Sequence, residues 1–131
     1  MGEGHFEVLD AAECSLLLRE ASVGRLAFDG PDGLTVLPLS YALDDERIVL
    51  RTGGQTQLAS LADGTPVAFE VDEFDPACRN GWSVVARGSL GRPAEGELTV
   101  EAGPEPFVPD TRELLLVISD ATLTGRAVAA A

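Results

Sequence analysis

The chain has 131 residues, 45% of them apolar, and a formal net charge of −13. A chain of this length and apolar content can bury a core of its own without metals or disulfides, so we expect a single domain. So negative a charge excludes nucleic acid and anionic membrane surfaces as partners, because both bind clustered positive charge. No apolar run approaches the roughly 18 residues that cross a membrane.

The absence of some residue types limits the catalytic mechanisms that this chain can use. The chain contains no lysine, and its single histidine, His5, lies in an N-terminal segment expected to be loosely ordered. Schiff-base and P-loop lysine chemistry are therefore excluded, and a Ser-His-Asp triad or a multi-histidine metal site is not expected. Any catalysis would draw its reactivity from a cofactor or from the substrate. Reduced thiols at Cys14 and Cys78, and a start without a signal-peptide pattern, predict a cytoplasmic protein.

The first predicted element is a helix. Asp10 followed by Glu13 forms a capping box, the signature of a helix start. Apolar residues then recur at the spacing of one helix face; they are Cys14, Leu17, Leu18 and Ala21. We expect this helix to cover one side of a sheet.

After Ser22 the pattern changes to that of strands. Residues 23–29, 34–43 and 47–52 predict three strands joined by two tight turns, the first at Gly30-Pro31-Asp32-Gly33 and the second at Asp44-Asp45-Glu46. In the third strand, Ile48 and Leu50 are expected to face the core, with Val49 on the opposite face.

The second half of the chain predicts one helix and three or four strands. Residues 56–62 predict a short helix after a glycine pair, and 67–72 alternate as a half-buried strand. A polar loop at 73–80 leads into a long strand from Gly81 to about Leu90. Residues 113–119 and 123–127 predict a final pair of strands or one bent strand, whereas 91–112 gives no clear prediction.

Six or so short strands joined mostly by tight turns favour a closed barrel over an open parallel sheet. One short helix between the third and fourth strands is too little for a doubly wound fold. The sequence therefore predicts a mostly β protein with two helices, one at the N-terminus and one short helix after the third strand.

The most suggestive segment for chemistry runs from Arg51 to Leu58. It passes from a strand end through Gly53-Gly54 to the start of a predicted helix, with hydroxyl groups and an arginine nearby. Free backbone amides at such a start, together with an arginine, can hold a phosphate. A plain connection between a strand and a helix has the same pattern, so the segment alone leaves both interpretations open.

Two other segments carry candidate site residues. Pro38-Leu39-Ser40-Tyr41 ends a predicted strand with a kink and two hydroxyl groups. Trp82, the only tryptophan, lies where a loop enters a strand, and its ring can either stack on a planar cofactor or fill the core.

Together these segments resemble the pyridoxamine 5′-phosphate oxidase-like family in its short actinobacterial form. The resemblance covers nearly the whole chain and follows the family's order of motifs. The matching segments are Val23–Ala27, Val36–Ala42, Val49–Gly53, Val67–Asp72, Gly81–Val85 and Leu123–Arg126.

The resemblance implies a six-stranded split barrel that forms a homodimer, with FMN in grooves at the interface. It implies that Arg51 and Thr52 contact the flavin phosphate with help from the 53–57 loop. The resemblance further implies that Pro38, Ser40 and Tyr41 border the flavin ring and that Trp82 and Ser83 line the site. The cofactor-binding residues predicted in this way are Pro38, Ser40, Tyr41, Arg51, Thr52, Gly53, Thr56, Gln57, Trp82 and Ser83.

The sequence departs from the family at two places. Flavin- and deazaflavin-binding members commonly have a lysine where this chain has Gln57, and losing a charged hydrogen bond costs about 1.5–3 kcal/mol. The C-terminal segment, with Arg126 alone, lacks the basic residues that hold the substrate phosphate in true pyridoxamine-phosphate oxidases. An FMN-dependent oxidoreductase acting on a small molecule is the leading hypothesis; a deazaflavin-dependent reductase and a cofactor-free dimeric binding or regulatory module are the alternatives.

Overall fold

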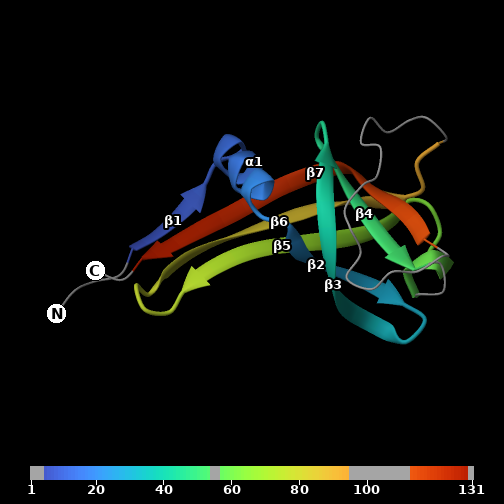
Figure 1. Cartoon of the computed structure of the whole chain (residues 1–131), viewed down its shortest axis with the longest axis horizontal. Helices are drawn as coiled ribbons and strands as arrows, with labels where there is room; N and C mark the ends of the chain where they lie inside the picture. Colours follow the sequence, from blue (N-terminus) through green and yellow to red (C-terminus); the bar gives the residue numbers. More distant parts are fainter. Residues whose placement is uncertain (1–4, 54–56, 95–112, 130–131) are drawn as a thin grey trace.

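The computed structural model describes residues 5–53, 57–94 and 113–129 (Figure 1). One α-helix, one short 3₁₀ helix and seven strands make up these residues. In chain order they are β1 (His5–Leu9), α1 (Ala11–Glu20), β2 (Val23–Gly30), β3 (Gly33–Asp44), β4 (Arg47–Gly53), η1 (Gln57–Ser60), β5 (Thr65–Asp75), β6 (Asn80–Gly91) and β7 (Glu113–Ala129).

Six strands close into a barrel, which confirms the predicted fold. All neighbours are antiparallel, in the order β7-β4-β3-β2-β5-β6, and a pairing of β6 with β7 closes the ring. The seventh strand, β1, pairs with the C-terminal part of β7 and extends the sheet beyond the ring. Closure removes the exposed strand edges that an open sheet of this size would leave.

The barrel interior holds one apolar core. Alternate residues of the strands point inward, Leu26 and Phe69 among them, and both are fully buried. Helix α1 is fixed by the predicted capping box: Asp10 accepts a hydrogen bond from the Glu13 amide, and the Glu13 side chain accepts one from the Asp10 amide. Its buried residue Leu18 belongs to this core, so the helix packs onto the inner side of the sheet, as expected.

Two elements in the first half of the chain, β1 and η1, differ from the prediction. The segment around His5 is not a loose tail but strand β1, which pairs with residues 125–129 of β7. Its five residues show no strong period of their own; the partner strand supplies the backbone hydrogen bonds. The predicted helix over 56–62 is only the short turn η1, Gln57–Ser60; residue 56 lies outside the described residues.

Two strands are longer than predicted, and one is more buried. The segment 73–80, predicted as a loop, is largely strand, because β5 and β6 pair from Thr65–Leu90 out to Asp75–Asn80. Val49, expected on an open face of β4, is fully buried, as is its partner Val117 at 3% exposure. Both faces of β4 are therefore covered at this position, which the alternation of neighbouring residues cannot reveal.

The final strand is single and bent. β7 runs for 17 residues, and Asp120 within it has a left-handed φ of 56°. Near that point the register with β6 shifts between Arg87 and Ser89. The bend lets the first part of β7 pair with β4 and the last part with β1.

Candidate functional site

The predicted phosphate-contacting residues lie at the end of β4. Strand alternation directs Thr52 into the barrel, where it is 6% exposed, and leaves the half-buried Arg51 on the opposite face. Opposite them on β7 lie Leu114 and Leu115, and the backbone of Gly53 pairs with Glu113. The two polar side chains are therefore fixed by a paired strand but point to different faces. Thr56 lies outside the described residues.

Gln57 is directed toward the turn between β2 and β3. Its side-chain Nε2 donates a hydrogen bond to the Asp32 carboxylate at 3.1 Å. Its Oε1 is buried and has no hydrogen-bond partner among the described residues. Gln57 thus presents a free acceptor, whereas a phosphate needs donors. The residue at the family's lysine position does not itself fit a phosphate in this arrangement.

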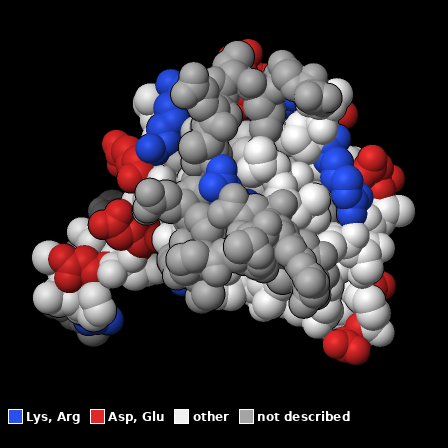
Figure 2. Space-filling model, turned by 45° about the vertical axis from the view of Figure 1, so that its right-hand side comes forward, with Lys and Arg blue, Asp and Glu red and all other residues white. Residues whose placement is uncertain are grey.

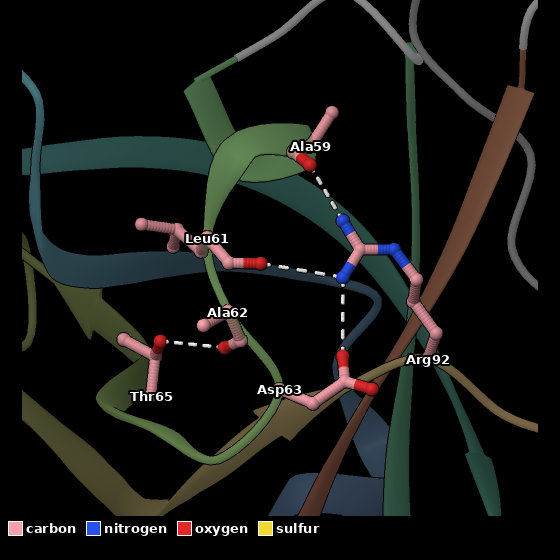
Figure 3. Close-up of polar contacts among 6 residues, drawn as sticks. All are labelled: Ala59, Leu61, Ala62, Asp63, Thr65 and Arg92. Atoms are coloured by element: carbon pink, nitrogen blue, oxygen red, sulfur yellow. Dashed lines mark hydrogen bonds and ion pairs between the residues drawn. The ribbon is translucent and has the colours of Figure 1, made fainter.

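The other end of η1 is held by Arg92, which sequence reasoning missed (Figure 3). The Arg92 guanidinium donates hydrogen bonds to the carbonyl oxygens of Ala59 at 2.5 Å and Leu61 at 3.2 Å. It also forms an ion pair with Asp63 at 3.1 Å. Arg92 follows β6 at the start of the segment 91–112, for which no clear prediction could be made, and no local pattern links it to residue 59.

Tyr41 belongs to the core. Its hydroxyl donates a hydrogen bond to the carbonyl oxygen of Leu18 in α1 at 2.5 Å, and its ring meets Phe69 edge-on, with centroids 5.2 Å apart. Burial raises the pKa of Tyr41 to about 12. The hydroxyl therefore joins α1 to the barrel. Pro38 and Ser40 alternate with Tyr41 and lie on the outer side of β3, Pro38 opposite Arg25 of β2.

Trp82 and Ser83 are neighbours on β6 but face opposite ways. Trp82 packs against the core from the inner side. Ser83 lies on the outer side, in a surface groove of about 460 Å³. Phe6, Phe74 and Arg126 line the same groove.

The two halves of the predicted site lie far apart in one protomer. Arg51 pairs with Leu115, whereas Ser83 pairs with Arg126, so most of the length of β7 separates them. A strand segment of that length spans about 30 Å. Figure 1 shows the end of β4 and the start of β6 at opposite ends of the molecule. One protomer therefore does not bring Arg51 and Ser83 together.

A broad outer face surrounds Ser83. We define it as the outward side chains of β1, β2, β5, β6 and the C-terminal part of β7. Across it Arg25 lies opposite Glu70, and Glu70 opposite Val85. Phe6 and Phe74 on this face are 63% and 56% exposed. The charged residues on it are three arginines and three acids: Arg25, Arg87, Arg126, Asp29, Glu70 and Asp72.

The centre of the outer face holds a linked charge cluster. Arg25 forms ion pairs with Glu70 at 3.1 Å and with Asp72 at 3.3 Å. Desolvation by burial, aided by the neighbouring Asp72, raises the pKa of Glu70 to about 7, against the opposing effect of Arg25. Figure 2 likewise shows arginines beside acids on the side it displays, without a broad basic patch among the described residues.

Two features were looked for in the described residues and not found: a cluster of metal-binding side chains and a membrane-spanning helix. No group of three or more histidine, cysteine, aspartate or glutamate side chains within them is arranged to hold a metal ion. Within the same residues no helix has the length and apolar content to cross a membrane.

Comparison with known proteins gives both family and fold. The chain is 35% identical over 85 residues to the uncharacterized protein Rv0080 of Mycobacterium tuberculosis, a match that covers 61% of this chain and 56% of that protein. The chain thus spans little more than half the length of this relative. A protein of unknown function from Corynebacterium diphtheriae, DIP1874, has a crystal structure that is 31% identical, with a TM-score of 0.74 over 93% of this chain and 97% of that one.

A second solved structure has the same fold at lower identity. The FAD-binding protein of Mycobacterium smegmatis is 24% identical and superposes with a TM-score of 0.69 over 94% of this chain and 98% of that chain. The family model for pyridoxamine 5′-phosphate oxidase matches residues 10–128. That match covers all the strands of the closed barrel together with α1, and the chain belongs to the pyridoxamine 5′-phosphate oxidase-like family.

Proposed function

We propose that this chain binds FMN and acts as an FMN-dependent oxidoreductase on a small molecule, as a homodimer with the cofactor at the interface. Family membership over residues 10–128 supports flavin binding, as does the shared fold with a protein described as FAD-binding. The bound flavin would supply hydride transfer, and the protein would supply binding, orientation and exclusion of water. Because the flavin would supply the reactive group, the protein would not need a lysine, which this chain lacks, or a histidine beyond His5.

The proposal that two copies share each site rests on the separation of Arg51 from Ser83. One flavin cannot contact both within a protomer, because about 30 Å of strand lies between them. A second copy that places its Ser83 end against the Arg51 end of the first would complete the site. Arg51 with Thr52 and Gly53 would then hold the phosphate, and the start of the partner's β6 would border the ring.

The outer face fits a second copy of this chain. The chain as a whole carries a charge of −13, which opposes self-association. On the outer face three arginines balance three acids, and two phenylalanines are more than half exposed. An apolar patch of balanced charge on a strongly acidic protein is where two copies can meet with least repulsion.

One alternative has a specific observation in its favour. Gln57 donates its amide hydrogen to Asp32 and leaves a buried acceptor, so the position offers a phosphate no charge. A cofactor-free dimeric module would need no donor there. A deazaflavin coenzyme, with its longer acidic tail, would need more basic residues near the groove than Arg51 alone.

The first experiment is a titration of the purified protein with FMN and with the deazaflavin coenzyme, followed by Trp82 and flavin fluorescence. The proposal predicts saturable quenching at micromolar FMN. Absence of binding at near-millimolar FMN would contradict the proposal of an FMN-dependent enzyme. The deazaflavin-dependent reductase and the cofactor-free module would then remain as alternatives.

The dimer is tested separately by sedimentation velocity. Phe74→Glu places a charge on the outer face and should yield a monomer, whereas Leu16→Glu, on an exposed position of α1, should leave the dimer intact. Equal behaviour of the two variants would argue against the outer face as the interface.

A further inference from the structure

We propose that a cavity between α1, the β3–β4 turn and the bend of β7 binds a small organic ammonium ion, a primary amine on a short apolar body. This space, here named the turn cavity, has a volume of about 210 Å³. It is separate from the proposed flavin site, because the β3–β4 turn lies at the opposite end of β4 from Arg51.

The turn cavity exists because the side chains on two of its walls are short. Ala11 and Ser15 lie one helical turn apart on α1, on the same face as the buried Leu18. On the other wall, Ala121 follows Asp120, whose left-handed φ of 56° marks the bend of β7. A larger side chain at residue 15 or 121 would fill the space between the helix and the strand.

The inner end of the cavity is apolar. Leu18 of α1 and Ile48 of β4 are buried in the core, and Leu43 pairs with Ile48 across the hairpin. Leu123 of β7 completes this lining. An apolar cavity of about 150 Å³ is large enough for benzene, whereas drug-sized ligands need roughly 300–1,000 Å³. The turn cavity therefore suits one aromatic ring or a short alkyl chain.

The outer end of the cavity is acidic. Asp45 and Glu46 form the β3–β4 turn, are exposed, and line the same cavity. The cation of this hairpin, Arg47, forms an ion pair with the buried Asp44 at 2.7 Å. No basic side chain is among the residues that line the cavity in the described part of the chain. Two carboxylates at the mouth favour a cation and repel an anion.

An ammonium ion suits this lining better than a metal ion does. Asp45 and Glu46 belong to no cluster of three or more metal-binding side chains within the described residues. An ammonium group has three N–H donors, and the cavity offers two carboxylates and the half-buried Ser15 hydroxyl as acceptors. Alkyl amines, like the lysine side chain, are charged at neutral pH. The ligand class is therefore a small amine whose apolar body enters the cavity.

The test is a ligand-observed NMR titration of the full chain at pH 7 and low salt. Three compounds of similar size are compared: phenethylamine, phenethyl alcohol and hydrocinnamate, which carry a cation, a neutral hydroxyl and an anion. The amine should bind saturably, the alcohol about fivefold more weakly, and the carboxylate more weakly still. Equal affinity for the amine and the alcohol would overturn the proposal.

A matched pair of charge variants tests the role of the carboxylates. Asp45→Asn with Glu46→Gln should weaken amine binding about fivefold and leave alcohol binding unchanged. Asparagine tolerates the left-handed φ of 59° at residue 45, so the turn is kept. Glu20→Gln with Glu73→Gln makes the same charge change at exposed residues outside the cavity lining and should leave both affinities unchanged. An equal loss in the two double variants would show general attraction of a cation to an acidic protein and would overturn the site.

A filling variant tests the location. Ala121→Leu should abolish binding of both the amine and the alcohol, and Ser15→Leu, on the opposite wall, should do the same if the first variant does not fold. Undiminished binding in a folded filling variant would place the amine elsewhere and overturn the proposal. These titrations contain no flavin, so their outcome is independent of whether the chain binds FMN.

Discussion

The side-chain amide of Gln57 donates a hydrogen bond to the Asp32 carboxylate at 3.1 Å and so joins η1 to the β2–β3 turn. A lysine at this position, which the family resemblance would favour, would meet that carboxylate. The ammonium and carboxylate would then neutralise each other, and little positive charge would remain for a phosphate.

This relationship predicts how FMN affinity responds to charge. Gln57→Lys alone should change the FMN dissociation constant by less than about threefold, because Asp32 pairs with the new ammonium. Gln57→Lys with Asp32→Asn should tighten FMN binding by about tenfold or more, the expected gain from a charged hydrogen bond to phosphate. Fluorescence titration measures both, with Asp32→Asn alone as the control. Equal affinity in the single and double variants would contradict the pairing.

Tyr41 should matter for stability and not for flavin binding. Tyr41→Phe removes the hydrogen bond to Leu18 and leaves a buried carbonyl without its donor, which should lower the free energy of unfolding by about 1–2 kcal/mol. The FMN dissociation constant should stay within about twofold of wild type. Urea denaturation and the same titration give the two values. A large loss of FMN affinity with unchanged stability would instead support the assignment of Tyr41 to the flavin ring.

Gly125 permits the close approach of α1 to the sheet. A Cβ atom there would lie 2.7 Å from the Cys14 sulfur and 3.0 Å from the Ser83 carbonyl oxygen. Gly125→Ala should therefore destabilise the protein by about 1–3 kcal/mol through overpacking. At Gly91 the nearest atoms, those of Asp63, are 4.0 Å away, so Gly91→Ala serves as the control and should be nearly neutral. Urea unfolding of the two variants decides the matter, and similar midpoints would argue against tight packing at residue 125.

Glu70 should make stability depend on pH. Its folded pKa is raised to about 7 from the usual 4.5, so the stability it contributes is present below about pH 4.5 and is lost as the pH rises through 7. Glu70→Gln removes this titration while keeping an acceptor for Arg25. The melting temperature of the variant relative to wild type should therefore be higher at pH 8 than at pH 5.

The control for this prediction is Glu20→Gln, an exposed acid at the end of α1. Its melting-temperature difference from wild type should be the same at both pH values. A pH-independent difference for Glu70→Gln would show that Arg25 and solvent offset the desolvation of the carboxyl group.

Much of the fold could be predicted from the sequence because its signals are local. The capping box at Asp10, the turns at 30–33 and 44–46, and the two-residue alternation of 67–71 are each formed by neighbouring residues, and the structure contains each of them. The order of the family motifs then specified a barrel. The number of strands in the closed ring was expected from the family resemblance, because the local patterns left open whether the last segment forms one strand or two.

Tertiary structure alone decided what depends on distant partners. β1 exists because β7 supplies its hydrogen bonds, and Val49 is buried although alternation along β4 assigns it to the outer face. The sequence identified Arg51 and Ser83 as candidates, but only the register of β7 showed that they lie at opposite ends of one protomer. Arg92 reaches residues about thirty positions away, and contacts across such a separation leave no periodic or local trace in the sequence.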